Sequence, residues 1–147
     1  MKNIIIYTDG ACSCNPGPGG WGAILMYKDT KKEISGYSPE TTNNQMELTA
    51  VIEALLMLKE PCKVQLYSDS AYVINAFNQD WISNWQQNGF KNAKRKPIEN
   101  IELWKRLINL NDYHDIEWIK VKGHADNPHN NRCDELARTE IEKNTNI

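Results

Sequence analysis

The sequence predicts an α/β fold in which helices flank a mixed β-sheet, on three observations. Three short strand-like segments precede the first helical pattern, later strand-like segments alternate with helical ones, and no repeat, low-complexity tract or linker interrupts the 147 residues. Strands joined by short turns pair antiparallel, whereas strands joined through a helix pair in parallel. We therefore expect an antiparallel meander extended by parallel strands, in one domain that spans residues 1–147.

Three strands are expected at the start of the chain. Ile4–Tyr7 is a β-branched run that ends on an aromatic residue, which is typical of a strand buried on both faces. Gly10–Gly22 is rich in Gly, Pro, Asn and Ser, which predicts a loop with tight turns. Gly22–Tyr27 and Glu33–Tyr37 have the composition of two further strands, joined by a hairpin connection at Asp29–Lys32.

The first long helix is expected after Thr41–Asn44, whose side chains can cap it, and to run to about Lys59, with Pro61 beyond its end. The elements expected after it are, in order, a strand at Val64–Tyr67, a helix at Ser70–Phe77, a short helix at Trp81–Gln87, an exposed basic loop at Lys91–Pro97, a helix at Ile101–Leu110, a strand at Ile116–Lys120, a polar loop at Gly123–Asn131 and a last helix from Arg132 to about Lys143.

Composition and charge exclude some classes of protein. The chain is 40% hydrophobic, but its longest apolar runs fall far short of the roughly 20 residues that a membrane span needs. We expect a cytoplasmic protein with reduced thiols, because no signal-peptide pattern is present and the four cysteines lack disulfide-framework spacing. A net charge of −2 argues against coating nucleic acid by bulk charge, and without a visible dimer patch a monomer is expected.

Four acidic residues stand in settings that suit metal-binding carboxylates. Asp9 and Asp69 each follow a predicted strand directly, so they lie at one edge of the sheet if these strands are parallel neighbours. Glu47 shares the apolar stripe of its helix, and Asp134 borders the apolar face of the last helix. Carboxylates that meet in a fold repel one another unless protons or cations neutralise them, and hard oxygen ligands suit Mg²⁺ or Mn²⁺.

Each of these acids also has a purely structural explanation. Asp9 with Gly10 is a common turn dipeptide, and Asp69 can cap a helix. Glu47 can complement the dipole at a helix start, and Asp134 can be a first-turn acid. The four together are harder to explain in this way, because all of them map to one side of the predicted sheet.

A set of segments in collinear order covers nearly the whole chain and resembles bacterial type 1 ribonuclease H. The segments are Tyr7–Gly10, Asn15–Gly20, Thr41–Leu48, Ser68–Ser70, Val121–Ala125 and Asn131–Ala137. The resemblance implies a single ribonuclease H domain with a five-stranded mixed sheet, its first three strands antiparallel and the others parallel, flanked by helices. It also implies an endonuclease that cuts the RNA strand of an RNA–DNA hybrid and leaves 5'-phosphate and 3'-hydroxyl ends.

The resemblance assigns a role to each acid. Asp9, Glu47, Asp69 and Asp134 match the metal-binding acids of the family one for one, which implies two Mg²⁺ ions, or Mn²⁺, in the active complex. Asp9 is expected to bridge both ions, with Glu47 and Asp69 on the leaving-group side and Asp134 on the side of the attacking water. His124 matches a loop histidine of the family and is expected to shuttle a proton or to help product release.

Substrate contacts are expected near the acids. Cys12 matches a position beside the RNA strand, and Thr42 matches a contact to a DNA phosphate. Four polar residues near the acids can read the 2'-hydroxyl that distinguishes RNA from DNA, although turn and capping chemistry also explains them. They are Asn15, Asn43, Asn44 and Gln45.

A second substrate surface is expected where aromatic and basic residues interleave, a pattern that suits a nucleic-acid strand. It comprises Trp81, Trp85, Phe90, Lys91, Lys94, Arg95 and Lys96, called the basic ridge below. Core packing is the alternative explanation for the tryptophans, and a solvated loop is the alternative for the cations.

The chain departs from the family pattern at residues that are expected to affect substrate affinity more than the catalytic step. Gln86–Asn88 occupy part of a protrusion that is usually richer in cations, and Phe90 stands where tryptophan is frequent. Glu40 lies where a basic residue is common, and Ala71 replaces a polar residue. We expect hybrid binding that is weaker and more salt-sensitive than in a typical bacterial relative.

Three rival functions stay open from the sequence. A resolvase or integrase core can share the sheet and the acids, but usually lacks the histidine loop and the basic protrusion. A hybrid-binding module with an inactive site is a second rival, and the presence of all four acids argues against it. A structural metal-binding domain is the third.

Overall fold

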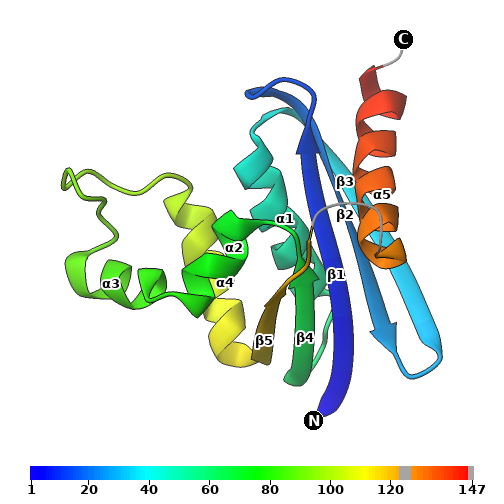
Figure 1. The fold of residues 1–147 in the computed structure, drawn as a ribbon, viewed down its shortest axis with the longest axis horizontal. Helices are drawn as coiled ribbons and strands as arrows, with labels where there is room; N and C mark the ends of the chain where they lie inside the picture. The colour runs from blue at the N-terminus through cyan, green and yellow to red at the C-terminus, as the bar shows by residue number, and fades with distance from the viewer. Residues whose placement is uncertain (123–126, 146–147) are drawn as a thin grey trace.

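The structure, a computed structural model, describes residues 1–122 and 127–145 (Figure 1). Its elements are β1 (Lys2–Cys12), β2 (Gly17–Tyr27), β3 (Thr30–Thr41), α1 (Asn43–Leu56), β4 (Cys62–Ser68), α2 (Ala71–Asn78), α3 (Trp81–Asn88), α4 (Ile101–Tyr113), β5 (Asp115–Lys120) and α5 (Pro128–Thr145). The strands form one five-stranded sheet in the order β3-β2-β1-β4-β5.

The sheet is mixed, as the sequence predicts. β1 pairs antiparallel with β2, and β2 pairs antiparallel with β3. β4 then adds to the other edge of β1 in parallel, and β5 adds to β4 in parallel. The hairpin connections account for the antiparallel half, and the helical crossovers account for the parallel half.

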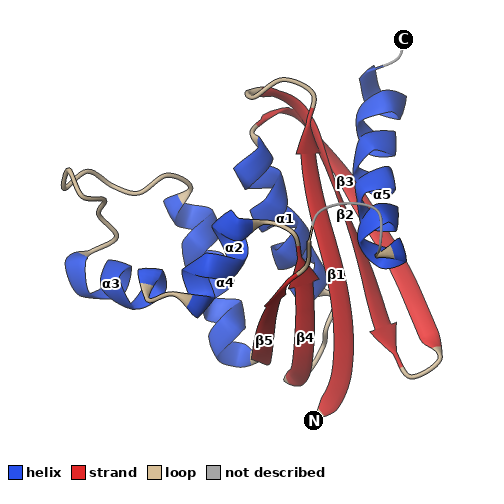
Figure 2. Cartoon of the chain, viewed as in Figure 1, coloured by secondary structure: helices blue, strands red, loops and turns tan. Residues whose placement is uncertain are grey.

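The first three strands are longer than predicted (Figure 2). The expected loop at Gly10–Gly22 is wrong over most of its length, because β1 continues to Cys12 and β2 begins at Gly17. The hairpin turn is also displaced: Lys28 takes a left-handed backbone with φ 53°, and β3 already begins at Thr30. Glycine counts against a strand in a sequence pattern, but here glycines in paired strands provide room for the helices above and below.

Two helix boundaries also differ from the prediction. α1 ends at Leu56, before the expected Lys59. α5 begins at Pro128, so the predicted loop is wrong for residues 128–131. The side chain of Asn127 caps this earlier start, because its Oδ1 accepts the backbone N–H groups of His129 and Asn130, each at 3.1 Å.

Helices α1 and α5 cover opposite faces of the sheet (Figure 1). A Cβ added at Gly10 would lie 2.5 Å from the backbone nitrogen of Glu47 on α1. A Cβ added at Gly22, which pairs with Asp9, would lie 2.6 Å from the carbonyl oxygen of Cys133 on α5. Neighbouring strand residues point to opposite faces, so the backbone of each helix approaches the sheet closely at a glycine.

The main core lies between the sheet and the layer of α1, α2 and α4. Ile6 and Leu66 from the sheet meet Leu48 from α1 and the fully buried Trp104 from α4. The predicted burial of Ile4–Tyr7 on both faces is wrong at Ile5, which is 37% exposed and lines an open groove at the start of β1.

Within residues 1–122 and 127–145, no helix is both long enough and apolar enough to cross a bilayer.

Candidate functional site

Asp9 and Asp69 meet where two parallel strands diverge. The pairing of β1 with β4 ends at Thr8 opposite Ser68, so the next residue of each strand is an aspartate. This confirms the predicted shared edge, although Asp9 lies inside β1 and not after it. Asp69 does not cap α2, because the Ser70 side chain accepts the N–H of Val73 at 3.3 Å.

Glu47 reaches the two aspartates from α1. The N–H of Gly10 donates to Glu47 Oε1 at 2.6 Å and to Asp9 Oδ1 at 2.9 Å, so one backbone group orients both carboxylates. Glu47 is only 8% exposed and lies beyond the first turn of α1. The predicted position on the buried helix face is therefore confirmed, and a role as an exposed dipole partner does not describe it.

These three carboxylates form a compact group of oxygen atoms. One oxygen from each of Asp9, Glu47 and Asp69 lies within 4.8 Å of the others. Glu47 Oε2 is buried, and the described residues offer it no hydrogen-bond donor. A buried carboxylate oxygen without a donor is costly unless a proton or a cation satisfies it.

The raised pKa values of two of these acids reflect the electrostatic cost of the arrangement. Burial, followed by the charge of Asp69, raises the pKa of Asp9 from 3.8 to about 7. Burial, followed by the charge of Asp9, raises the pKa of Glu47 well above its usual range. The group therefore retains protons near neutral pH in the absence of a cation.

The residues present fit a divalent cation. Clustered carboxylate oxygens are the ligands that Mg²⁺ and Mn²⁺ prefer, and the orphaned oxygen of Glu47 gives such an ion an acceptor that no described donor uses. Asp9, Glu47 and Asp69 are the residues that would hold it.

Asp134 stands apart from this compact group. It lines the same open hollow of about 450 Å³, and its charge is a smaller contributor to the raised pKa of Asp9. Its Oδ2 instead accepts from Arg138 Nε at 2.9 Å, one turn further along α5. Asp134 is therefore positioned to join a cation site from the α5 side, but in this conformation its partner is an arginine that sequence analysis did not single out.

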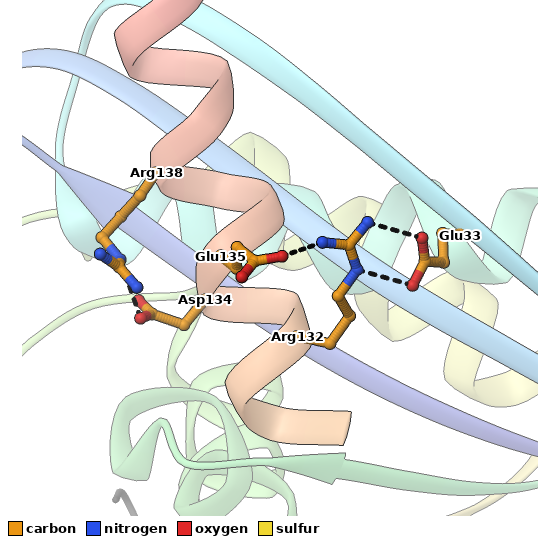
Figure 3. A network of polar contacts seen from close by, with 5 residues as sticks. All are labelled: Glu33, Arg132, Asp134, Glu135 and Arg138. Atoms are coloured by element: carbon orange, nitrogen blue, oxygen red, sulfur yellow. Dashed lines mark hydrogen bonds and ion pairs between the residues drawn. The ribbon is translucent and has the colours of Figure 1, made fainter. Parts of the chain in front are cut away.

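A neighbouring ion-pair network fixes the start of α5 (Figure 3). Arg132 donates through Nε and Nη2 to both carboxylate oxygens of Glu33 on β3, at 2.8 and 3.0 Å, and it also contacts Glu135. A bidentate pair between a helix and the edge strand constrains the rotation of the helix. The network thereby helps to set the side of α5 from which Asp134 faces the hollow.

The predicted substrate contacts near the acids divide into residues that line the hollow and residues beside it. Cys12 and Asn43 line the hollow together with the acids. Asn15 lies at its rim, where its Oδ1 accepts the backbone N–H of Asn43 at 3.1 Å. Thr42 caps α1 by accepting the N–H of Gln45 at 3.2 Å, so the capping alternative holds for Thr42 without excluding a substrate contact.

The aromatic residues of the basic ridge are partly buried, whereas its cations are exposed. Trp81 and Trp85 pack against the core, and the ring of Trp85 lies 5.1 Å from that of Trp104, so the packing alternative describes both. Phe90 is half-buried, with Lys105 Nζ 5.3 Å from its ring centre. The four ridge cations are all exposed, which leaves them accessible to a phosphate backbone; they are Lys91, Lys94, Arg95 and Lys96.

Two histidines, His124 and His129, fall in the stretch predicted as a polar loop. His124 lies outside the described residues, so its expected role stays a prediction. His129 is not in a loop but half-buried in the first turn of α5, with its ring 5.0 Å from that of Tyr7.

Sequence reasoning missed residues that organise the site without chemistry of their own. Gly10 and Arg138 are examples, because their roles depend on which element packs beside them. Asn100 is another example. Its backbone is left-handed, with φ 59°, whereas in the sequence an asparagine before a helical pattern indicates no more than a helix cap.

Comparisons with known proteins agree with this geometry. Residues 1–142 match the family model described as RNase H. A ribonuclease H from Moorella thermoacetica is 61% identical over 141 residues, which cover 96% of this chain and 93% of the relative.

Solved structures extend the likeness to the fold. LC9-RNase H1, described as a type 1 RNase H with the type 2 active-site motif, has a TM-score of 0.87 at 30% identity, covering 99% of this chain and 74% of that one. LC11-RNase H1, solved in complex with an RNA/DNA hybrid, has a TM-score of 0.70 at 26% identity, covering 96% of this chain and 98% of that one.

The raised pKa of Asp9 predicts a specific pH dependence of stability. Since the pKa rises from 3.8 to about 7 on folding, ionisation of Asp9 opposes folding of the metal-free protein above pH 7, and this cost disappears as the pH falls towards 4. Asp9→Asn should therefore stabilise the protein by about 1–3 kcal/mol at pH 8 in EDTA, and by little at pH 4. Urea unfolding at both pH values measures the difference.

Asp29→Asn, at an exposed position in the hairpin turn, is the matched control and should change the free energy of unfolding little at either pH. A destabilised Asp9→Asn variant at pH 8 would contradict the electrostatic account of the site.

Proposed function

The chain belongs to the ribonuclease H family, and we propose that it is an endonuclease that hydrolyses the RNA strand of RNA–DNA hybrids and leaves 5'-phosphate and 3'-hydroxyl ends. The observation that carries the proposal is the compact group of Asp9, Glu47 and Asp69, which lines an open hollow and in which Asp9 and Glu47 are buried. Hydrolysis of a phosphodiester requires an activated water and neutralisation of charge at phosphorus, and the group is suited to hold the cations that serve both needs.

Asp9, Glu47, Asp69 and Asp134 would together hold two divalent ions, with Glu47 and Asp69 serving the leaving-group side and Asp134 the side of the attacking water. Such ions, when bound, supply an activated water and stabilise the leaving oxygen. The chain's own contribution is orientation: the N–H of Gly10 fixes Asp9 and Glu47, and burial keeps bulk water from screening their charge.

Asp134 would have to exchange its partner to take part. Its pair with Arg138 is exposed on both sides, with side chains 44% and 60% accessible, and exposed pairs of this spacing are weak, about 0.3–0.5 kcal/mol. The pair is therefore an easily broken restraint, and Asp134 can turn towards the hollow at little cost.

Recognition of RNA would come from the residues at the rim of the hollow. Asn43 offers an exposed amide beside the acids, and Cys12 lines the same hollow. An amide both donates and accepts hydrogen bonds, and so does a ribose 2'-hydroxyl. The DNA strand lacks this hydroxyl, so the amide can distinguish RNA from DNA. The exposed ridge cations would track the phosphates of the second strand.

Substrate selectivity tests the proposal directly. Incubated with Mg²⁺, the protein should cleave an RNA–DNA hybrid and leave duplex RNA, duplex DNA and single strands intact. Asp69→Asn should abolish turnover, because it removes one of the charges that hold the cations, while circular dichroism should show the fold unchanged. Asp29→Asn should retain full activity.

Cleavage of duplex DNA would instead favour a resolvase-like nuclease of the same fold. Tight hybrid binding without cleavage would favour an inactive binding module. Retained activity of Asp69→Asn would exclude the proposed role of the acids.

The ridge cations predict a salt dependence that can be altered. Replacing Lys94 and Arg95 by glutamine should weaken hybrid binding and flatten the plot of log affinity against log salt concentration by about 1–2 in slope, because about 0.9 counterion is released per phosphate contact. Fluorescence anisotropy at several KCl concentrations measures this.

Lys31 and Lys32 on β3 provide the matched control, since they are equally exposed and lie on the edge strand. Their replacement by glutamine should leave the slope unchanged. An unchanged slope for the Lys94 and Arg95 variant would remove the ridge from the substrate surface.

A further inference from the structure

A continuous chain of hydrogen bonds runs from the first turn of α1 to the centre of the core. Gln45 Nε2 donates to Asn100 Oδ1 at 3.2 Å, and Asn100 Nδ2 donates to the Tyr72 hydroxyl at 3.2 Å. Trp104 Nε1 donates to the same hydroxyl at 2.9 Å. The chain therefore joins a residue expected to contact substrate with a tryptophan that is 0% exposed.

Asn100 is placed unusually for its residue type. It occupies the N-cap position of α4, where asparagine ordinarily accepts a hydrogen bond from the helix, yet its side chain makes no capping bond. Its backbone is left-handed, with φ 59° and ψ 32°, a conformation that asparagine tolerates better than most residues other than glycine. The amide that could have capped α4 spans instead from Gln45 to Tyr72.

Tyr72 is the fixed partner of this amide on the core side. Its ring packs 5.3 Å from that of the buried Trp104, so its hydroxyl has little freedom to move. In the structure that hydroxyl accepts from both Trp104 and Asn100, so the nitrogen of the Asn100 amide faces Tyr72 and its oxygen faces Gln45.

The orientation passes on to Gln45 in the same way. The hydroxyl of Thr41 donates to Gln45 Oε1 at 2.8 Å, while Gln45 Nε2 donates to Asn100. Both ends of the Gln45 amide are therefore assigned. An amide has two N–H groups and two oxygen lone pairs, so one of each is left to meet a ligand in a fixed direction.

We propose that Tyr72 and Asn100 are positioning residues that hold the Gln45 amide, and with it the first turn of α1, in the orientation that binds the hybrid. The inference rests on the proposed function, because it takes the ligand of Gln45 to be the sugar–phosphate backbone of the hybrid. A preoriented amide binds without losing rotamer freedom at the moment of contact, so the contribution appears in affinity and not in the chemical step.

Tyr72→Phe is the most direct variant, because it removes one hydroxyl and keeps the ring that packs on Trp104. The dissociation constant of the hybrid, measured by anisotropy in EDTA, should rise about three- to ten-fold. The value of kcat at saturating hybrid with Mg²⁺ should stay within about two-fold. Asn100→Gly, which keeps the left-handed backbone but deletes the amide, should weaken binding to the same extent.

Asn111→Ala is the matched control for stability. Trp118 Nε1 donates to Asn111 Oδ1 at 3.0 Å, so this variant also leaves an indole N–H without its acceptor, on β5 and with no link to Gln45. It should lower the free energy of unfolding as Tyr72→Phe does, with no change in hybrid affinity. Equal weakening of hybrid binding by both variants would reduce the effect to stability and overturn the proposal.

A double-mutant cycle with Gln45→Ala tests the positioning role separately from the proposed function. If Tyr72 acts through Gln45, the two substitutions together should weaken binding no more than Gln45→Ala alone. Fully additive effects, or weakening by Gln45→Ala with none by Tyr72→Phe, overturn the positioning role and leave the proposed function intact. A wild-type protein that binds no hybrid overturns the proposed function itself.

Discussion

Repulsion among three close carboxylates, two of them buried, is the constraint on which the site depends. Asp9, Glu47 and Asp69 bring their oxygens within 4.8 Å of one another, in a part of the fold where burial raises the pKa of Asp9 and of Glu47. Placing these like charges close together destabilises the fold, and nothing in the described structure fully offsets that cost. The arrangement is instead suited to a cation, whose binding converts the repulsion into coordination.

The rest of the fold maintains this unfavourable cluster by close approach of backbones. Gly10 lets α1 come near enough for its N–H to hold two carboxylates, and Gly22 lets α5 lie directly on β2 beside Asp9. Arg132 ties α5 to Glu33 on β3, which limits how the helix can turn. Rigid elements thus carry the acids, while the residues expected to contact substrate stand at the rim.

The sequence predicted the features that depend on local pattern, and it missed those that depend on which element lies beside which. The strand–acid pairs at Asp9 and Asp69 and the buried face of Glu47 follow from periodicity. The extension of β1 past Gly10 could not be predicted, because glycine weakens a strand in a sequence pattern, and the close approach of α1 at Gly10 is known only from the packed structure. The Arg138 partner of Asp134 and the bridge through Asn100 likewise depend on side-chain directions that only the packed structure defines.

Proton release on cation binding tests the central claim most directly. Titration calorimetry of Mg²⁺ into the wild-type protein, run at pH 7 in two buffers of different ionisation enthalpy, counts the protons that leave. If Asp9 and Glu47 share protons that a cation displaces, about one proton should be released per protein molecule at pH 7, and fewer at pH 9. Binding without proton release at pH 7 would show that the carboxylates are already ionised, and would contradict the account of the site.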